Sequence, residues 1–255
     1  MQRGTPGITA IVIAHNEERH IRACLETLAW ADARLVLDAF SADRTPELAA
    51  GLAIVHQRPF DTFARQRNAA LDLAATEWAF FLDADERCPP ELGAEIRARV
   101  SEAARTAGGP AGFWVPRRNY ILGRWVRHAG WWPDEQLRVL RRGRARYDED
   151  RDPHEVVTLQ GAAGHLTQPI IHFNYASVGQ LFAKQHAYAQ REARALRATG
   201  LPRKPRWLLT QPLREFHRRY VQWQGYREGL LGLFLCLLMA WYRFQVERYA
   251  RTSRP

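Results

Sequence analysis

The chain has 255 residues, of which 46% are hydrophobic, and it carries a formal net charge of +10. This length can bury a large core without disulfide or metal staples, and this composition excludes a disordered chain, a collagen and a coiled coil. The three cysteines, Cys24, Cys88 and Cys236, are far apart and form no CxxC pair. This spacing argues against a disulfide framework or a zinc site and favours a reducing compartment.

The excess positive charge lies in the second half of the sequence. Residues 1–110 carry a net charge of −4, residues 111–200 carry +6, and residues 201–255 carry +8. A basic segment indicates nucleic acid or an anionic membrane as a partner. The acidic first part is therefore not a nucleic-acid surface.

Strands and helices alternate over the first 105 residues. Apolar runs predict strands at residues 8–14, 34–38, 54–55 and 78–82. Helical spacing predicts a helix capped by Asn16, and further helices at residues 46–50, 62–75 and 90–105. This alternation predicts an α/β fold with a parallel sheet flanked by helices.

After residue 110 the pattern loosens into short strands, which we predict at residues 113–116, 136–140 and 170–173. Ser177, with Gln180 three residues on, predicts the cap of a helix that ends before Gly200. Pro202 and Pro205 mark a linker. We therefore divide the chain into a domain of residues 1–200, with halves at 1–110 and 111–200, and a helical tail of residues 201–255.

Acidic residues follow the strand predicted at residues 78–82. Asp83 and Asp85 are two apart on an extended segment, so their side chains point to the same side. At the carboxyl end of a central strand they would face the crevice where open α/β sheets bind ligands. Their oxygens suit Mg²⁺ or Mn²⁺ bound to substrate phosphates. A solvated acidic turn before the next helix accounts for the same residues without a metal.

Polar residues also follow the first two strands: Asn16 and Glu17 after one, and Asp38 at the end of the other. Each alone is typical of a helix cap or a turn, but together with Asp83 they indicate a polar crevice. The sequence contains no GxGxxG and no GxxxxGK[ST] loop. This disfavours a dinucleotide or a P-loop nucleotide and favours a nucleotide held by carboxylates and a bridging metal.

Four motifs follow one another over residues 8–100, namely ITAIVIAHNEE, LVLDAFSADRT, FARQRNAAL and FFLDADE. In order and spacing they resemble glycosyltransferase family 2, whose members have the Rossmann-like GT-A fold. Three later segments, PDEQLRVLRR, DPHEVV and IIHFNYAS, are similar to a branch that contains bacterial lipopolysaccharide-core glucosyltransferases. The resemblance implies an inverting, metal-dependent enzyme that moves a sugar, with UDP-glucose as the suggested donor, to a cell-envelope glycolipid.

The resemblance also implies roles for individual residues. Contacts to the nucleotide sugar are implied for Asn16, Glu17, Asp38, Arg67 and Asn68, and the metal-diphosphate motif for Asp83 and Asp85, with Asp85 the more direct ligand. One departure from the family is Ala39-Phe40, where many members carry Asp-Gly before Ser41.

Three residues of the later segments are further candidates. Glu155 would be the general base that removes the proton of the acceptor hydroxyl, although many members carry a Glu-Asp pair at His154-Glu155. His172 either completes the metal site, contacts the diphosphate, or is a hydrogen-bonded core residue. Arg138 either holds a phosphate or is a solvated surface residue.

The basic tail contains an apolar run, Leu230–Tyr242, of 13 residues, whereas a bilayer span needs ~20. Arginines and aromatic residues around this run are typical of helices that lie in a membrane interface and attract anionic lipid. Because residues 1–7 contain no apolar signal-peptide segment, we expect a peripheral enzyme on the inner face of the bacterial cytoplasmic membrane. Alternatively, the apolar run belongs to a buried helix that packs on the catalytic domain.

Other functions compete with this one. A polyprenyl phosphate is an alternative acceptor. A nucleic-acid-binding protein would use the basic tail, but the acidic first half and the apolar run argue against it. A catalytically silent scaffold is disfavoured because Asp83, Asp85 and Glu155 are all present.

Overall fold

The computed structural model describes residues 6–149, 156–175, 177–200 and 204–252. By its internal contacts the chain forms two compact units. The first unit comprises residues 1–117 and 135–172, and the second comprises residues 118–134 and 173–255. Our division at residues 110 and 200 follows the Gly and Pro residues of the sequence and stays a prediction.

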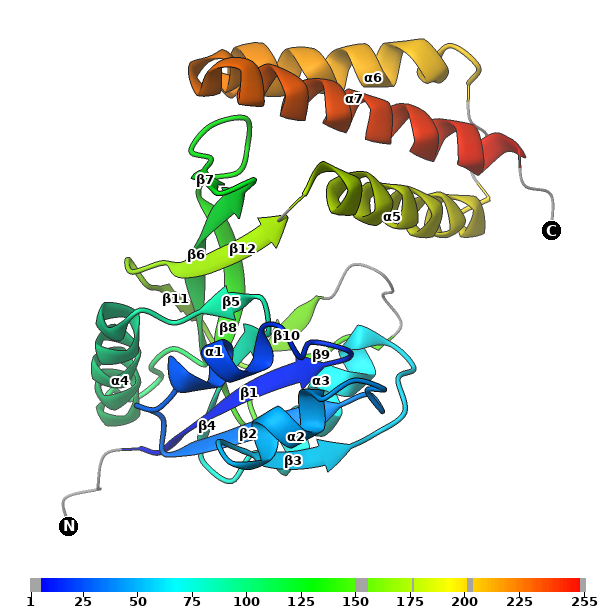
Figure 1. The fold of residues 1–255 in the computed structure, drawn as a ribbon. Helices are drawn as coiled ribbons and strands as arrows, with labels where there is room; N and C mark the ends of the chain where they lie inside the picture. Colours follow the sequence, from blue (N-terminus) through cyan, green and yellow to red (C-terminus); the bar gives the residue numbers. More distant parts are fainter. Residues whose placement is uncertain (1–5, 150–155, 176, 201–203, 253–255) are drawn as a thin grey trace. The chain divides into compact units, whose positions relative to one another are not determined.

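The first part of the chain alternates strands and helices as the sequence predicts (Figure 1). In chain order these elements are β1 (Ile8–Ala14), α1 (Ile21–Glu26), β2 (Ala33–Asp38), α2 (Thr45–Ala50), β3 (Ile54–Gln57), α3 (Phe63–Leu73), β4 (Trp78–Asp83), β5 (Glu86–Arg87) and α4 (Pro90–Arg105). Strands β3, β2, β1 and β4 lie side by side in that order and are parallel. Parallel strands end at one edge of a sheet, so the residues that follow β1, β2 and β4 share that edge.

The remaining strands extend this sheet into a mixed one. They are β6 (Gly112–Ile121), β7 (Arg124–Trp125), β8 (Asp134–Arg141), β9 (Ala145–Tyr147), β10 (Val157–Leu159), β11 (Ala163–His165) and β12 (Ile170–Tyr175). Beyond β4 the sheet continues through β8, which is antiparallel to β4, and then through β6, β12 and β5. Strands β9 and β10 form a separate antiparallel pair. The three short strands predicted after residue 110 are confirmed, and each is longer than expected.

Both faces of the parallel sheet are buried, which explains why its strands are apolar without alternation. On one face Val12 and Phe80 pack with residues of α1 and α4. On the other face Ile11 and Phe81 pack with residues of α3. Neighbouring residues of a strand thus serve opposite faces, and burying each large apolar side chain contributes about 1.5–3 kcal/mol.

The first helix differs from its prediction. It starts only at Ile21, and the side chain of His20, the residue at the N-cap position before it, makes no capping hydrogen bond. The prediction that Asn16 caps this helix is therefore wrong. By contrast, the side-chain oxygen of Thr62 accepts a hydrogen bond from the backbone N–H of Arg65, 3.2 Å away, and caps α3. The three cysteines are all buried and free, as their spacing predicts.

The second unit is mainly helical (Figure 1). It contains α5 (Val178–Ala198), α6 (Trp207–His217), the π-helix η1 (Arg218–Gln222), the 3₁₀-helix η2 (Gly225–Glu228) and α7 (Gly229–Thr252). Helix α7 packs against both α5 and α6. The hydroxyl of Ser177 accepts from the N–H of Gln180, which confirms the predicted cap of α5. Among the described residues, one helical segment, Gly225–Arg251, is long and apolar enough to cross a membrane, and a third of an apolar stretch of 18 residues within it is buried.

Asn68 ties α3 to β9. Its side chain accepts a hydrogen bond from the N–H of Tyr147 (2.9 Å) and donates to the carbonyl of the same residue (3.0 Å). It also donates to a carboxylate oxygen of Glu149 (2.8 Å), and only 2% of its surface is exposed.

Replacing Asn68 with alanine leaves the backbone of Tyr147 without these partners. We expect the free energy of unfolding to fall by about 2–4 kcal/mol, measured by urea denaturation. Asp72→Ala, on the same helix, removes only a surface ion pair with Arg146 and should change stability little. Equal losses for the two variants would contradict a tethering role of Asn68.

Candidate functional site

The loops after β1 and β2 are joined by hydrogen bonds. The N–H of Asn16 donates to the hydroxyl of Ser41 (2.8 Å), and the side-chain oxygen of Asn16 accepts from the N–H of Ala42 (2.9 Å). The N–H of Glu17 donates to the hydroxyl of Thr45 (2.7 Å). Asn16 has a φ of 57°, a left-handed conformation that asparagine tolerates better than most residues. The structure therefore brings the predicted residues Asn16 and Glu17 to the loop that follows Asp38.

Asp38 is fully buried at the end of β2. One of its oxygens accepts from the N–H of Ser41 (3.0 Å) and from the side chain of Gln57 (3.2 Å), and the other accepts from the Ser41 hydroxyl (2.5 Å). These donors compensate a buried carboxylate for its loss of water. Its position next to the Asn16 loop agrees with the predicted crevice.

Phe40 adopts a left-handed backbone conformation, with a φ of 55°, and its side chain is exposed. Such a φ is strained for a bulky residue and costs glycine nothing. The glycine that the family resemblance implies at this position would adopt this φ without strain. In this chain the backbone adopts the same left-handed turn with a phenylalanine, at a cost in conformational strain.

Asp83 and Arg138 form the centre of the site. Two nitrogens of the Arg138 guanidinium donate to the two oxygens of Asp83, at 3.0 and 2.5 Å. Arg67, from α3, donates to one of the same oxygens (3.2 Å). Arg138 is 4% exposed, so it is not the solvated surface residue of the alternative interpretation.

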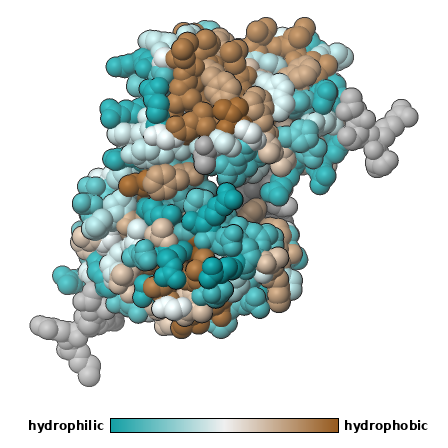
Figure 2. Space-filling model, viewed as in Figure 1, coloured by the Kyte–Doolittle hydropathy of each residue, from teal (hydrophilic) through white to brown (hydrophobic). Residues whose placement is uncertain are grey.

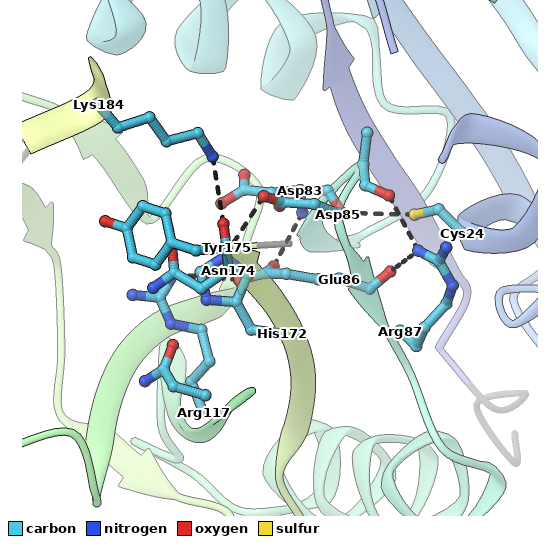
Figure 3. A network of polar contacts seen from close by, with 12 residues as sticks. Cys24, Asp83, Asp85, Glu86, Arg87, Arg117, His172, Asn174, Tyr175 and Lys184 are labelled. Carbon is cyan, nitrogen blue, oxygen red and sulfur yellow. Dashed lines mark hydrogen bonds and ion pairs between the residues drawn. The ribbon is translucent and has the colours of Figure 1, made fainter. Parts of the chain in front are cut away.

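Glu86 is the residue of this site that sequence reasoning missed. It is fully buried and accepts hydrogen bonds from Arg138 and Arg117, both at 3.1 Å, and from the N–H of Asp83 (2.9 Å). Figure 3 shows Glu86 beside Asp83 and Arg117. Its place directly after the two aspartates was visible in the sequence, but nothing there indicated two arginine partners from distant strands.

This network sets the charge of its members. Burial by itself would raise the pKa of Asp83, but Arg138 and Arg67 outweigh burial and hold this pKa well below its ordinary value. Burial would likewise lower the pKa of Arg138, but Asp83 and Glu86 raise it well above its ordinary value. Both groups of the pair are therefore charged at neutral pH.

Asp85 points instead toward His172. A carboxylate oxygen of Asp85 lies 3.5 Å from Nε2 of His172, and the imidazole is almost completely buried (Figure 3). His172 lies opposite Glu86 in the pairing of β12 with β5, which brings the histidine to the acidic segment. The structure thus joins Asp85 and His172 and places the two aspartates in different surroundings.

Two other predicted residues come from α3, and one lies elsewhere. Arg67 stacks near the rings of Phe81 and Tyr147, whereas the amide of Asn68 is occupied by β9. Their contacts with a nucleotide stay predictions. Glu155, the predicted general base, lies outside the described residues.

Among solved structures, the chain is similar to the mannosyltransferase PcManGT from Pyrobaculum calidifontis, in complex with GDP-Man and Mn²⁺. The TM-score is 0.57 at 14% identity, with 98% of this chain and 88% of the other covered. It is also similar to S. aureus TarS in complex with UDP, with a TM-score of 0.51 at 15% identity and coverage of 97% and 92%. These likenesses confirm the fold.

In sequence, the chain is 29% identical over 266 residues to the lipopolysaccharide core biosynthesis glycosyltransferase LpsC of Rhizobium meliloti (strain 1021). The match covers 97% of this chain and 95% of LpsC. The mostly parallel sheet and its polar edge are those of a nucleotide-sugar glycosyltransferase with a GT-A-like fold. The family model described as glycosyl transferase family 2 matches residues 9–160, and the chain belongs to this family.

The pair of Asp83 and Arg138 predicts a pH dependence of stability. The pKa of Asp83 is depressed in the folded state. Its contribution to the free energy of unfolding is therefore complete above the pKa of an unfolded aspartate, about 3.9, and is lost as the pH falls through the pKa of the folded state. We expect Asp83→Asn to be less stable than the native protein at pH 7. In urea titrations the difference in free energy of unfolding between the native protein and Asp83→Asn should be constant above about pH 5 and should shrink below about pH 4. A difference in free energy of unfolding that grows in acid would contradict the depressed pKa of Asp83.

Proposed function

We propose that this enzyme transfers a sugar, with inversion, from a nucleoside diphosphate donor to a glycolipid of the bacterial cell envelope. UDP-glucose is the first candidate for the donor, and a lipopolysaccharide core is the first candidate for the acceptor. The observation that carries the proposal is the acidic segment at the end of β4, with buried arginines on Asp83 and a histidine beside Asp85. The similarity to LpsC along almost the whole of both chains supports the choice of acceptor.

Asp85 and His172 fit a divalent cation, but Asp83 does not. The carboxylate oxygen of Asp85 and the ring nitrogen of His172 converge to 3.5 Å, and such oxygen and nitrogen donors suit Mn²⁺, with Mg²⁺ as the alternative. Both oxygens of Asp83 are already bonded to arginine, so its proposed direct contact with a metal becomes a positioning role. A bound cation would neutralise charge on the departing diphosphate.

The chain's own residues would divide the remaining tasks. Asp38 and the Asn16 loop form one wall of the polar edge and would hold the nucleoside. Arg67 and Arg138 carry fixed positive charge beside Asp83 and would stabilise the developing charge of the diphosphate. Glu155 is proposed to take the proton of the acceptor hydroxyl.

Release of nucleoside diphosphate from a panel of nucleotide sugars tests the donor reaction. The panel is run with Mn²⁺ or Mg²⁺, and with a lipopolysaccharide-core acceptor or a polyprenyl phosphate. We expect Asp85→Ala to lose at least a hundredfold in turnover, because a ligand to the cation is removed. Asp72→Ala removes an exposed carboxylate of the same unit and should retain full activity. No turnover with any donor, or equal turnover by Asp85→Ala, would defeat the proposal.

We further propose that the second unit contacts an anionic membrane. Large apolar side chains are exposed on its helices, and in Figure 2 apolar surface gathers over α6 and α7. We define this apolar surface as Leu209, Leu213, Val221, Leu230 and Leu237, which are 50–86% exposed. The segment that carries it, residues 201–255, has a net charge of +8, which attracts anionic lipid.

Flotation with vesicles that contain phosphatidylglycerol tests this contact. We expect the double change Leu209→Asp and Leu213→Asp to weaken binding at least tenfold, because two exposed leucines of α6 would lose their burial in lipid. Ile54→Asp places a charge on an equally exposed apolar residue of the first unit and should bind like the native protein. Unchanged binding of the double variant would exclude this apolar surface as the contact.

A further inference from the structure

The second unit contains two arginines that stack on one tryptophan. The guanidinium carbons of Arg118 and Arg127 lie 4.2 and 4.1 Å from the ring centroid of Trp125. Trp132 meets Trp125 edge to face, with centroids 5.7 Å apart. We call Arg118, Trp125, Arg127 and Trp132 the arginine–tryptophan cluster.

The two positive charges of this cluster have no counter-charge within the described part of the chain. Neither guanidinium forms an ion pair there, and the buried Nε of Arg118 has no hydrogen-bond partner. Several other arginines that are exposed or half-buried pair with a carboxylate: Arg44 with Glu47, Arg58 with Asp61, Arg97 with Asp32, and Arg141 with Glu77. Two like charges beside one ring repel each other, so a bound anion would relieve the arrangement.

A carboxylate that contacts the loop after β7, that of Glu228, is used for another purpose. Glu228 accepts hydrogen bonds from Nδ1 of His128 (2.6 Å) and from the backbone N–H groups of Arg127 and His128 (2.9 and 3.1 Å). Burial would raise the pKa of Glu228, but the bond from His128 outweighs it and lowers this pKa. Glu228 therefore stays charged and fixes the backbone of the loop, and it leaves the guanidinium of Arg127 to other ligands.

Further bonds hold the same loop in place. The carbonyl of Ala129 accepts from Arg219 (2.7 Å), and its N–H donates to the carbonyl of Trp223 (2.8 Å). The side chain of Asn119 donates to the carbonyl of Trp131 (3.1 Å). A backbone fixed from several sides presents its side chains in one geometry, which is a requirement of a binding site.

We propose that the arginine–tryptophan cluster binds a phosphate or carboxylate group on the glycan of the acceptor. Guanidinium forks match the oxygens of both groups in geometry and charge, and the half-buried ring of Trp132 supplies apolar surface beside them. This inference rests on the proposed function, because it names the chemical class of the acceptor: an anionic sugar. The phosphate of a lipid headgroup has the same chemistry, and the experiment separates the two sources.

Calorimetric titration with mannose 6-phosphate, compared with mannose, tests the cluster in the full chain. We expect the phosphorylated sugar to bind at least tenfold more tightly than the neutral one. Arg127→Gln and Arg118→Gln should each weaken its binding at least tenfold. Arg124→Gln removes the same charge from an exposed position on the same hairpin and should bind like the native protein. Because Arg127 is exposed, its variant should fold even if Arg118→Gln does not.

Four outcomes would overturn the inference. Native-like binding by Arg127→Gln, or no preference for the phosphorylated sugar, would show that the cluster is no anion site. Loss of binding in Asp85→Ala would place the sugar phosphate in the donor site. Binding to phosphatidylglycerol vesicles that falls tenfold in Arg127→Gln, with sugar-phosphate binding unchanged, would assign the cluster to lipid. Because this titration needs no turnover, failure of the donor reaction leaves its result intact.

Discussion

The pairing of Asp83 and Glu86 with buried arginines is the constraint on which the rest of the site depends. Removing charged groups from water is costly, and only close, well-aligned partners recover the cost. Here the partners come from three different elements: Arg67 from α3, Arg117 from β6 and Arg138 from β8. The network therefore fixes these elements against the end of β4 and holds positive charge at the place where the sheet presents its acidic segment.

The same network gives the two aspartates of the segment different tasks. Asp83 is bonded to arginine, whereas a carboxylate oxygen of Asp85 lies beside His172. From the sequence alone the two carboxylates cannot be told apart, because both project to one side of an extended segment. Only their neighbours in space show that Asp83 is paired with arginine and that Asp85 lies beside a histidine.

The sequence predicted the parallel half of the fold well, because both periodicity and turn residues depend on local contacts. The strands at residues 8–14, 34–38 and 78–82 are confirmed, and so are the helices that follow residues 62 and 89. Asn16 was misassigned because the bonds that decide its role go to Ser41 and Ala42, more than 20 positions away. Glu86 was missed for the same reason. Long-range partners of a polar residue leave no periodic trace.

Three residues of α3, Arg65, Arg67 and Asn68, together restrict how this enzyme can change. Arg67 reaches Asp83, whereas Asn68 and Arg65 both hold Glu149, the last described residue before the segment that carries Glu155. One helix thus contacts both the acidic segment and Glu149. Successive residues of a helix point 100° apart, so inserting or deleting one residue in α3 would disturb both contacts at once. Mutations along this helix should consequently be strongly non-additive, and the two contacts can evolve only together.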